Sequence, residues 1–146
     1  MKKNKIIFFL IFLIYPFFSY SHVIHYGKFK IIEMDVLRNG KKIGYNKYLF
    51  KNQNNLLIVK NEINFVVKLI GINLLNVDGS STETYKNGKL IKFKSDTIQN
   101  KKKKYNKLML NEDKKTFKIK GSSFNGNVPS TVLVGNWWNH SNLQSE

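Results

Sequence analysis

The stretch LIVKNEINFVVKL, residues 57–69, decides the class of fold. Its odd positions are almost all apolar, whereas the positions between them include Lys60, Glu62, Asn64 and Lys68. Side chains that alternate with a period of two lie on opposite faces of a β-strand. One apolar and one wet face are typical of an antiparallel sheet whose second face meets water. The stretch therefore predicts one long, half-buried strand.

Turn signals separate this stretch from others with the same alternation, at residues 91–94 and 117–120. The strongest are Asn39-Gly40 and Asn87-Gly88, because a type I′ hairpin turn requires a positive φ at both central residues. Polar clusters predict further turns at residues 52–55, 78–81, 99–100, 111–113 and 121–123. The chain is predicted to be all-β, with at least six antiparallel strands.

The C-terminal part differs from the preceding strands in composition. Residues 121–129 are rich in Gly, Ser and Asn and predict a loop. Residues 130–139 predict a short helical turn begun by Ser130 or Thr131, which follow Pro129. We expect a curved antiparallel sheet or half-barrel whose open face is closed by this helical plug. The pair Trp137-Trp138 fits either ligand stacking or the core, and the core is favoured because an indole buries a large area.

The first 21 residues predict a secretory signal peptide. A basic start with Lys2, Lys3 and Lys5 precedes an apolar run at residues 6–18, and small residues lead to a cleavage site after Ser21. An uncleaved anchor is the alternative, although the run is short for a bilayer span. We expect residues 22–146 to form one domain without a transmembrane segment after cleavage. The expected location is the periplasm of a Gram-negative-type bacterium.

The charge of the chain is strongly positive. The formal net charge is +16, yet 24 of the 25 basic residues are lysine and only Arg38 is arginine. Selected phosphate sites favour arginine, whose planar fork binds phosphate through two hydrogen bonds. The composition therefore argues against nucleic acid as the partner. The densest basic run lies at an expected turn and can be interpreted either as a solvated loop or as a polyanion-binding site. It comprises Lys101, Lys102, Lys103 and Lys104.

No catalytic or metal-binding pattern stands out. His22 and His25 are two isolated histidines at the expected mature terminus. The sequence has no cysteine and only nine acidic residues that could complete a metal site. The serines do not occur in a Gly-x-Ser-x-Gly turn, and nothing in the spacing selects two carboxylates. We therefore expect a protein that is not an enzyme and that uses neither a metal nor a cofactor.

Several short motifs resemble those of a family of exported bacterial proteins classed as a domain of unknown function. They are LRNGKKIG at 37–44, ETYKNGKL at 83–90, Pro129, WWN at 137–139, and Leu143-Gln144. This family is similar to lipoprotein-carrier half-barrels of the LolA/LolB type, in which a curved sheet wraps an apolar cavity closed by helices. The resemblance implies no catalytic residues. Relatives continue past the Trp-Asn motif with further strands, which implies a shorter sheet or a truncated product here.

These patterns together predict a non-enzymatic envelope protein that binds a hydrophobic, acyl-chain or lipid-like ligand on its concave sheet. A packed core without a cavity is the structural alternative. The functional alternative is a scaffold or polyanion-binding protein that uses the lysine-rich surface. The sequence leaves the oligomeric state open. The candidate ligand-binding residues are Val59, Ile63, Phe65, Val67, Leu69, Phe93, Trp137 and Trp138.

Overall fold

The computed structural model of the protein describes residues 28–132, 134–135 and 138, and these residues contain eight β-strands and no helix. The signal-peptide segment and Trp137 lie outside the described residues. The strands are β1 (Ile31–Arg38), β2 (Lys41–Gln53), β3 (Leu56–Leu69), β4 (Ile72–Lys86), β5 (Lys89–Gln99), β6 (Lys102–Asn111), β7 (Thr116–Gly121) and β8 (Asn125–Pro129).

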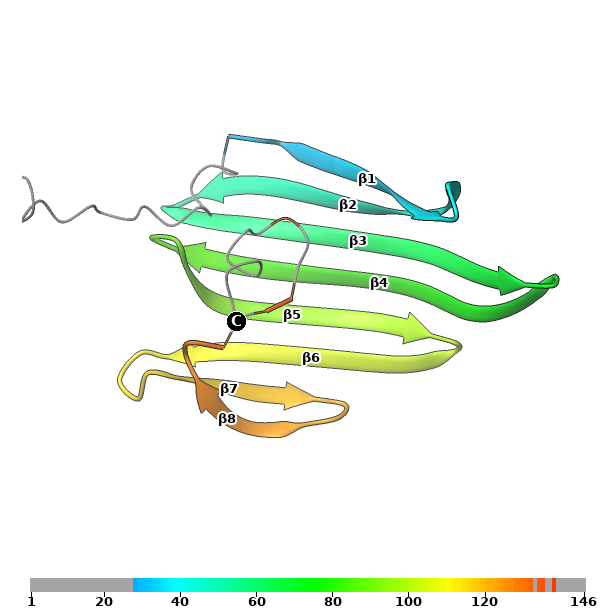
Figure 1. Ribbon diagram of the computed structural model, residues 1–146. Helices are drawn as coiled ribbons and strands as arrows, with labels where there is room; N and C mark the ends of the chain where they lie inside the picture. The colour runs from blue at the N-terminus through cyan, green and yellow to red at the C-terminus, as the bar shows by residue number, and fades with distance from the viewer. Residues whose placement is uncertain (1–27, 133, 136–137, 139–146) are drawn as a thin grey trace, which may run out of the picture.

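The strands form one curved antiparallel sheet in the order of the sequence, β1 to β8 (Figure 1). Each strand pairs with the next, and the sheet stays open with β1 and β8 at its two edges. The predicted all-β, antiparallel architecture is therefore confirmed. The stretch at 57–69 lies entirely within β3, as its alternation indicated.

Five of the connections are two-residue turns with a positive φ at both positions. Asn39-Gly40 and Asn87-Gly88 are two of them, which confirms the predicted hairpins. Asn54-Asn55 and Asn100-Lys101 are two more, at sites where polar clusters predicted turns. The fifth is Ile70-Gly71, between β3 and β4, where the sequence carries no such signal.

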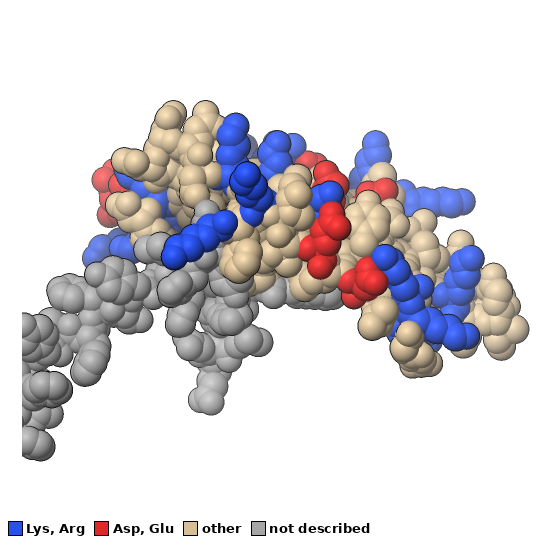
Figure 2. Space-filling model, turned by 90° about the horizontal axis from the view of Figure 1, so that it is seen from above, with Lys and Arg blue, Asp and Glu red and all other residues tan. Residues whose placement is uncertain are grey.

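The two faces of the sheet are chemically different. We call the face that carries Tyr48, Val59 and Tyr85 the inner face, because Trp138 packs on it. The Trp138 ring makes edge-to-face contacts with Phe50 and Tyr85, at centroid distances of 5.4 and 5.7 Å. On the opposite, outer face, a directly paired row includes Lys60, Lys94, Lys107 and Lys120. Figure 2 shows such basic side chains spread along the molecule.

Predicted turns or loops were wrong in whole or in part at two glycine- and serine-rich segments and at the lysine run. Residues 78–81 are not a turn but the middle of β4, because Gly79 packs closely against Ile63 and Thr97. The segment 121–129 is not all loop: its first residues form the predicted turn, and Asn125–Pro129 pairs with β7 as strand β8. Lysines 102–104 likewise belong to β6, and only Lys101 lies in the turn.

The segment 130–139 was expected to form a helical turn. Its described residues include no helix and run as a turn and irregular backbone. Even so, Trp138 is buried in the hydrophobic cluster of the inner face. The segment therefore contributes to the core through this side chain, as the structural interpretation of the tryptophan pair indicated.

Candidate functional site

A band of small polar side chains crosses the middle of the inner face. Residues directly opposite one another in antiparallel strands share a face, and this register aligns one residue from each of five strands. We call these residues the polar band: Tyr48 (β2), Asn61 (β3), Ser81 (β4), Ser95 (β5) and Asn106 (β6). The band separates the buried apolar cluster at one end of the sheet from apolar residues further along β3.

Hydrogen bonds fix the β2–β3 end of the band. The Asn61 side-chain amide donates to Asn46 Oδ1 and, at 3.1 Å, to the backbone carbonyl of Lys47. Asn46 Nδ2 in turn donates to the Tyr48 hydroxyl at 3.1 Å. Buried amides are stabilised when they are hydrogen-bonded. The chain of contacts therefore holds these side chains in set orientations.

A buried carboxylate lies next to the band. Glu83 is 2% exposed and lies between Val59 and Phe93 in the register of the sheet. Its Oε2 accepts a hydrogen bond of 2.6 Å from the Tyr85 hydroxyl. Burial of a carboxylate is unfavourable unless partners compensate for the lost water. Glu83 is therefore a buried carboxylate that depends on hydrogen-bond donors such as the Tyr85 hydroxyl.

The polar residues surround a cavity of about 220 Å³ on the inner face. Among the described residues, Asn46 and Glu83 are the two buried polar side chains, and both line it. A side chain at Gly79 would place its Cβ 3.2 Å from Ile63 Cγ2 and from Thr97 Oγ1, so glycine leaves this space open. The rest of the lining comprises Tyr48, Asn61, Ile63, Gly79, Ser80, Ser81, Phe93, Ser95, Thr97 and Gly135.

A second hollow of about 360 Å³ continues the site toward β7. It shares Ser95 and Thr97 with the first cavity and reaches Asn106 and Gly121. Asn106 Oδ1 is buried and accepts no hydrogen bond from any described residue. The two hollows therefore follow the polar band across the sheet. A larger hollow of about 680 Å³ lies at the opposite end of the sheet, where it is lined by the turns after β2 and β4 and by the strand residues beside them.

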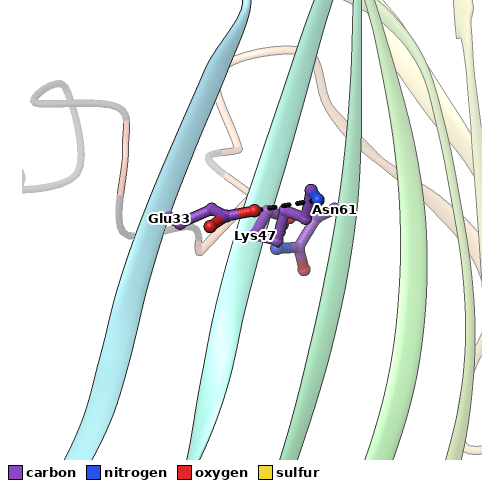
Figure 3. Close-up of polar contacts among 3 residues, drawn as sticks. All are labelled: Glu33, Lys47 and Asn61. Carbon is purple, nitrogen blue, oxygen red and sulfur yellow. Dashed lines mark hydrogen bonds and ion pairs between the residues drawn. The ribbon is translucent and has the colours of Figure 1, made fainter.

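The outer face behind this site carries an ion pair (Figure 3). Lys47 Nζ lies 2.8 Å from Glu33 Oε1, across the β1–β2 pair. The hydrogen bond to Glu33, and then its charge, raises the pKa of Lys47 above the ordinary lysine value of 10.5. A raised lysine pKa stabilises the folded state while the lysine is protonated in both states, and this contribution is lost as the pH rises through the folded-state pKa. The ion pair therefore supports the sheet throughout the neutral pH range.

Comparison with known families identifies the family to which this chain belongs. A family model for a domain of unknown function, DUF6134, matches residues 34–146. The chain belongs to the DUF6134 family. The match runs from β1 through every later strand and includes the polar band and Glu83. No curated protein and no solved structure matches the chain.

The DUF6134 match confirms the resemblance to a domain-of-unknown-function family, and it includes all of the motifs on which that resemblance rested. The half-barrel carriers and the export of the chain receive no support from it. Within the described residues, no helix is long and apolar enough to cross a bilayer, and no three His, Cys, Asp or Glu residues gather as metal ligands. His22, His25 and His140 lie outside the described residues.

The sequence-predicted ligand residues are dispersed along the sheet. Ile63 and Phe93 line the 220 Å³ cavity, whereas Val59 and Trp138 belong to the buried cluster. Phe65 and Val67 are half-buried beyond the band, and Leu69 is exposed at the end of β3. Lys101, Lys102, Lys103 and Lys104 are all exposed where β6 begins. Sequence reasoning missed Asn46, Ser81, Glu83 and Ser95, and the one signal was Asn61, the polar member of the apolar alternation.

Proposed function

We propose that this DUF6134 protein binds an amphiphilic, lipid-like molecule on its inner face, as a non-enzymatic binding protein of the bacterial periplasm. The observation that carries the proposal is that the two buried polar side chains, Asn46 and Glu83, line the same cavity. Ligand sites typically combine apolar walls with a few placed polar groups. The export signal predicted for residues 1–21 supports the proposed location.

The distribution of side chains fits a ligand with two parts. The polar band offers amides and hydroxyls to a polar head group, and Asn106 Oδ1 supplies an acceptor that no described residue uses. Beyond the band, Ile63, Phe65 and Val67 present half-buried apolar surface along β3. Gly44 lies opposite Phe65 and lets β2 approach β3 closely, because a Cβ at Gly44 would overlap the Asn64 carbonyl oxygen and Phe65 Cα and Cβ. An acyl chain fits this direction, and the head group fits the band.

The test is binding of a fluorescent fatty-acid analogue to the purified protein. Ser95→Phe places a ring in the cavity and should weaken binding about tenfold, because the ring displaces part of the ligand and removes its apolar contacts. Lys94→Phe is the matched control, since Lys94 is the neighbouring residue on the outer face. Circular dichroism checks that both variants keep the β-sheet spectrum.

Two results would count against the proposal. One is a folded wild-type protein that binds no apolar probe at any salt concentration. The other is equal weakening of probe binding by Ser95→Phe and Lys94→Phe, which would show that the probe does not bind specifically on the inner face. Glu83→Gln sharpens the test, because it keeps the shape of the side chain and removes its charge. We expect this variant to change the preference between probes with a free carboxyl group and the corresponding methyl esters.

A further inference from the structure

One hairpin extends beyond the rest of the sheet. β2 pairs with β3 only as far as Phe65, and β5 pairs with β4 only from Val77 onward. The two arms of residues 66–76 therefore pair only with each other and have no further strand beside them, and they project from the end of the sheet (Figure 1). We call residues 66–76 the projecting hairpin.

The projecting hairpin is apolar and exposed. Ile70 is 93% exposed, and three further apolar side chains, Leu69, Ile72 and Leu74, are each at least 50% exposed. Isolated exposed apolar residues are ordinary, whereas a contiguous group of them marks an interaction surface. Phe124, in the turn between β7 and β8 at the same end of the sheet, is exposed as well.

The turn residue itself is unusual. Ile70 adopts φ +49°, a left-handed conformation that is strongly unfavourable for a β-branched residue. The other four two-residue turns all place asparagine at this position, as Asn39, Asn54, Asn87 and Asn100. Asparagine tolerates this conformation and isoleucine does not. The geometry of the turn therefore does not favour isoleucine at this position.

Neighbouring residues hold the projecting hairpin in place from both sides. Arg38 Nη1 donates to the carbonyl of Lys68 at 3.1 Å. On the other side, Asn100 Oδ1 accepts from the Asn76 amide at 2.8 Å, and its Nδ2 donates to the carbonyl of Leu74 at 3.1 Å. The apolar end is thus presented in a fixed orientation.

Basic residues surround the hairpin. In a sheet of consecutive hairpins, alternate turns lie at the same end, so the turns after β1, β3 and β5 are neighbours (Figure 1). These segments, 36–44, 66–77 and 97–106, contain no acidic residue, although Asp35, Asp78 and Asp96 border them and Asp35 pairs with Lys42 at 2.7 Å. Figure 2 shows blue basic side chains beside the uncharged surface at the right-hand end. The basic residues of this end are Arg38, Lys41, Lys42, Lys68, Lys101, Lys102, Lys103 and Lys104.

We infer that the projecting hairpin docks on an anionic lipid bilayer, with Ile70 and its apolar neighbours inserted and the surrounding lysines at the head groups. The positive charge favours an anionic membrane as the partner. Each basic residue near such a membrane adds to the binding free energy, and an apolar group at the membrane boundary adds the free energy gained when its surface leaves water. A narrow, projecting apolar end enters a fluid interface, whereas an obligate protein interface requires a broad patch. The inference is independent of the ligand proposed for the inner face.

The experiment uses a local probe, so that the apolar N-terminal segment does not contribute to the signal. The chain has no cysteine, and Ile70→Cys therefore gives a single site for an environment-sensitive fluorophore. Vesicles of phosphatidylcholine and phosphatidylglycerol should shift and enhance its emission, and vesicles of phosphatidylcholine alone should not. The matched control is Met109→Cys, an exposed apolar site on β6 away from the hairpin, which should show no change.

Variants then separate insertion from simple charge attraction in vesicle co-sedimentation. Ile70→Asn should lower affinity for anionic vesicles by roughly tenfold, the loss of one inserted apolar side chain. The melting temperature of this variant should equal or exceed that of the wild type, because asparagine suits the turn, so misfolding cannot explain the loss. Replacement of lysines 101–104 by glutamine should lower affinity at least about a hundredfold.

Three outcomes would overturn the inference. The first is an unchanged signal at Ile70 with anionic vesicles. The second is Ile70→Asn bound as tightly as the wild type while the lysine variant is lost, which would leave a polyanion surface without insertion. The third is a concentration-dependent dimer in solution that Ile70→Asn dissociates, which would assign the hairpin to a second copy of the chain.

Discussion

Both ends of the β3–β4 pair carry apolar side chains, and these are buried to opposite degrees. At one end, Leu57, Val59 and Tyr85 are in the buried cluster, with β2 and β5 on either side and Trp138 above them. At the other end, Leu69, Ile70 and Ile72 extend past their neighbours and are exposed. The alternation of apolar and polar residues in a strand thus shows which residues share a face. Flanking strands and covering segments decide whether that face is buried from solvent.

The sharpest test of this comparison places a charge at each end. Val59 is fully buried, so Val59→Asp should lower the free energy of unfolding by at least about 4 kcal/mol, the cost of burying an unpaired charge. Ile70→Asp should not lower it, because the site is exposed and aspartate tolerates the left-handed conformation that isoleucine resists. Urea denaturation followed by circular dichroism measures both.

A milder variant keeps this test informative if Val59→Asp does not fold. Val59→Ala removes two methyl groups and should cost about 2 kcal/mol. Equal effects of aspartate at positions 59 and 70 would show that the hairpin end is covered in solution.

The next largest effect concerns the cover of the buried end. Trp138→Ala removes the ring that contacts Phe50 and Tyr85, and it should cost about 3 kcal/mol of unfolding free energy. Val132→Ala is the control from the same segment, because Val132 is exposed and should have little effect. If both variants unfold at the wild-type urea concentration, the segment does not stabilise the sheet.

The smallest effect should be confined to the projecting end. Asn100→Ala removes two hydrogen bonds to the hairpin and places alanine at φ +48°, which together should cost about 1–2 kcal/mol. Amide hydrogen exchange should accelerate at residues 66–76 and stay unchanged around Val59. Asn111→Ala, whose side chain accepts a hydrogen bond in the turn after β6, is the matched control. Faster exchange at both ends after Asn100→Ala would mean that the hairpin and the core open together.

Local chemistry accounts for what the sequence predicted correctly. Alternation predicted β3, and the Asn-Gly pairs predicted two hairpins, because both signals depend on residues a few positions apart. The errors also have a local cause. Gly79 signalled a turn by composition, whereas its role is to make room for Ile63 and Thr97 on adjacent strands. Those contacts depend on the register between strands, which composition does not encode.

The polar band shows the same limit for the site. Ser81 and Ser95 belong to different strands and become one site only because the register places them opposite each other. The projecting hairpin escaped prediction for a different reason, since Ile70 is the residue type least expected at a left-handed turn position. Site and hairpin thus both arise where the sequence departs from what local folding alone would favour.

The order of the strands has a consequence for how the sheet forms. Every pairing among β1 to β8 joins neighbours in sequence, so each step closes a short loop and loses little chain entropy. This topology allows growth by addition of one hairpin to the next, and individual hairpins form on the order of microseconds. Asn46, Asn61 and Glu83 lie on three consecutive strands, β2, β3 and β4, so pairing of these three strands alone brings the polar half of the cavity together.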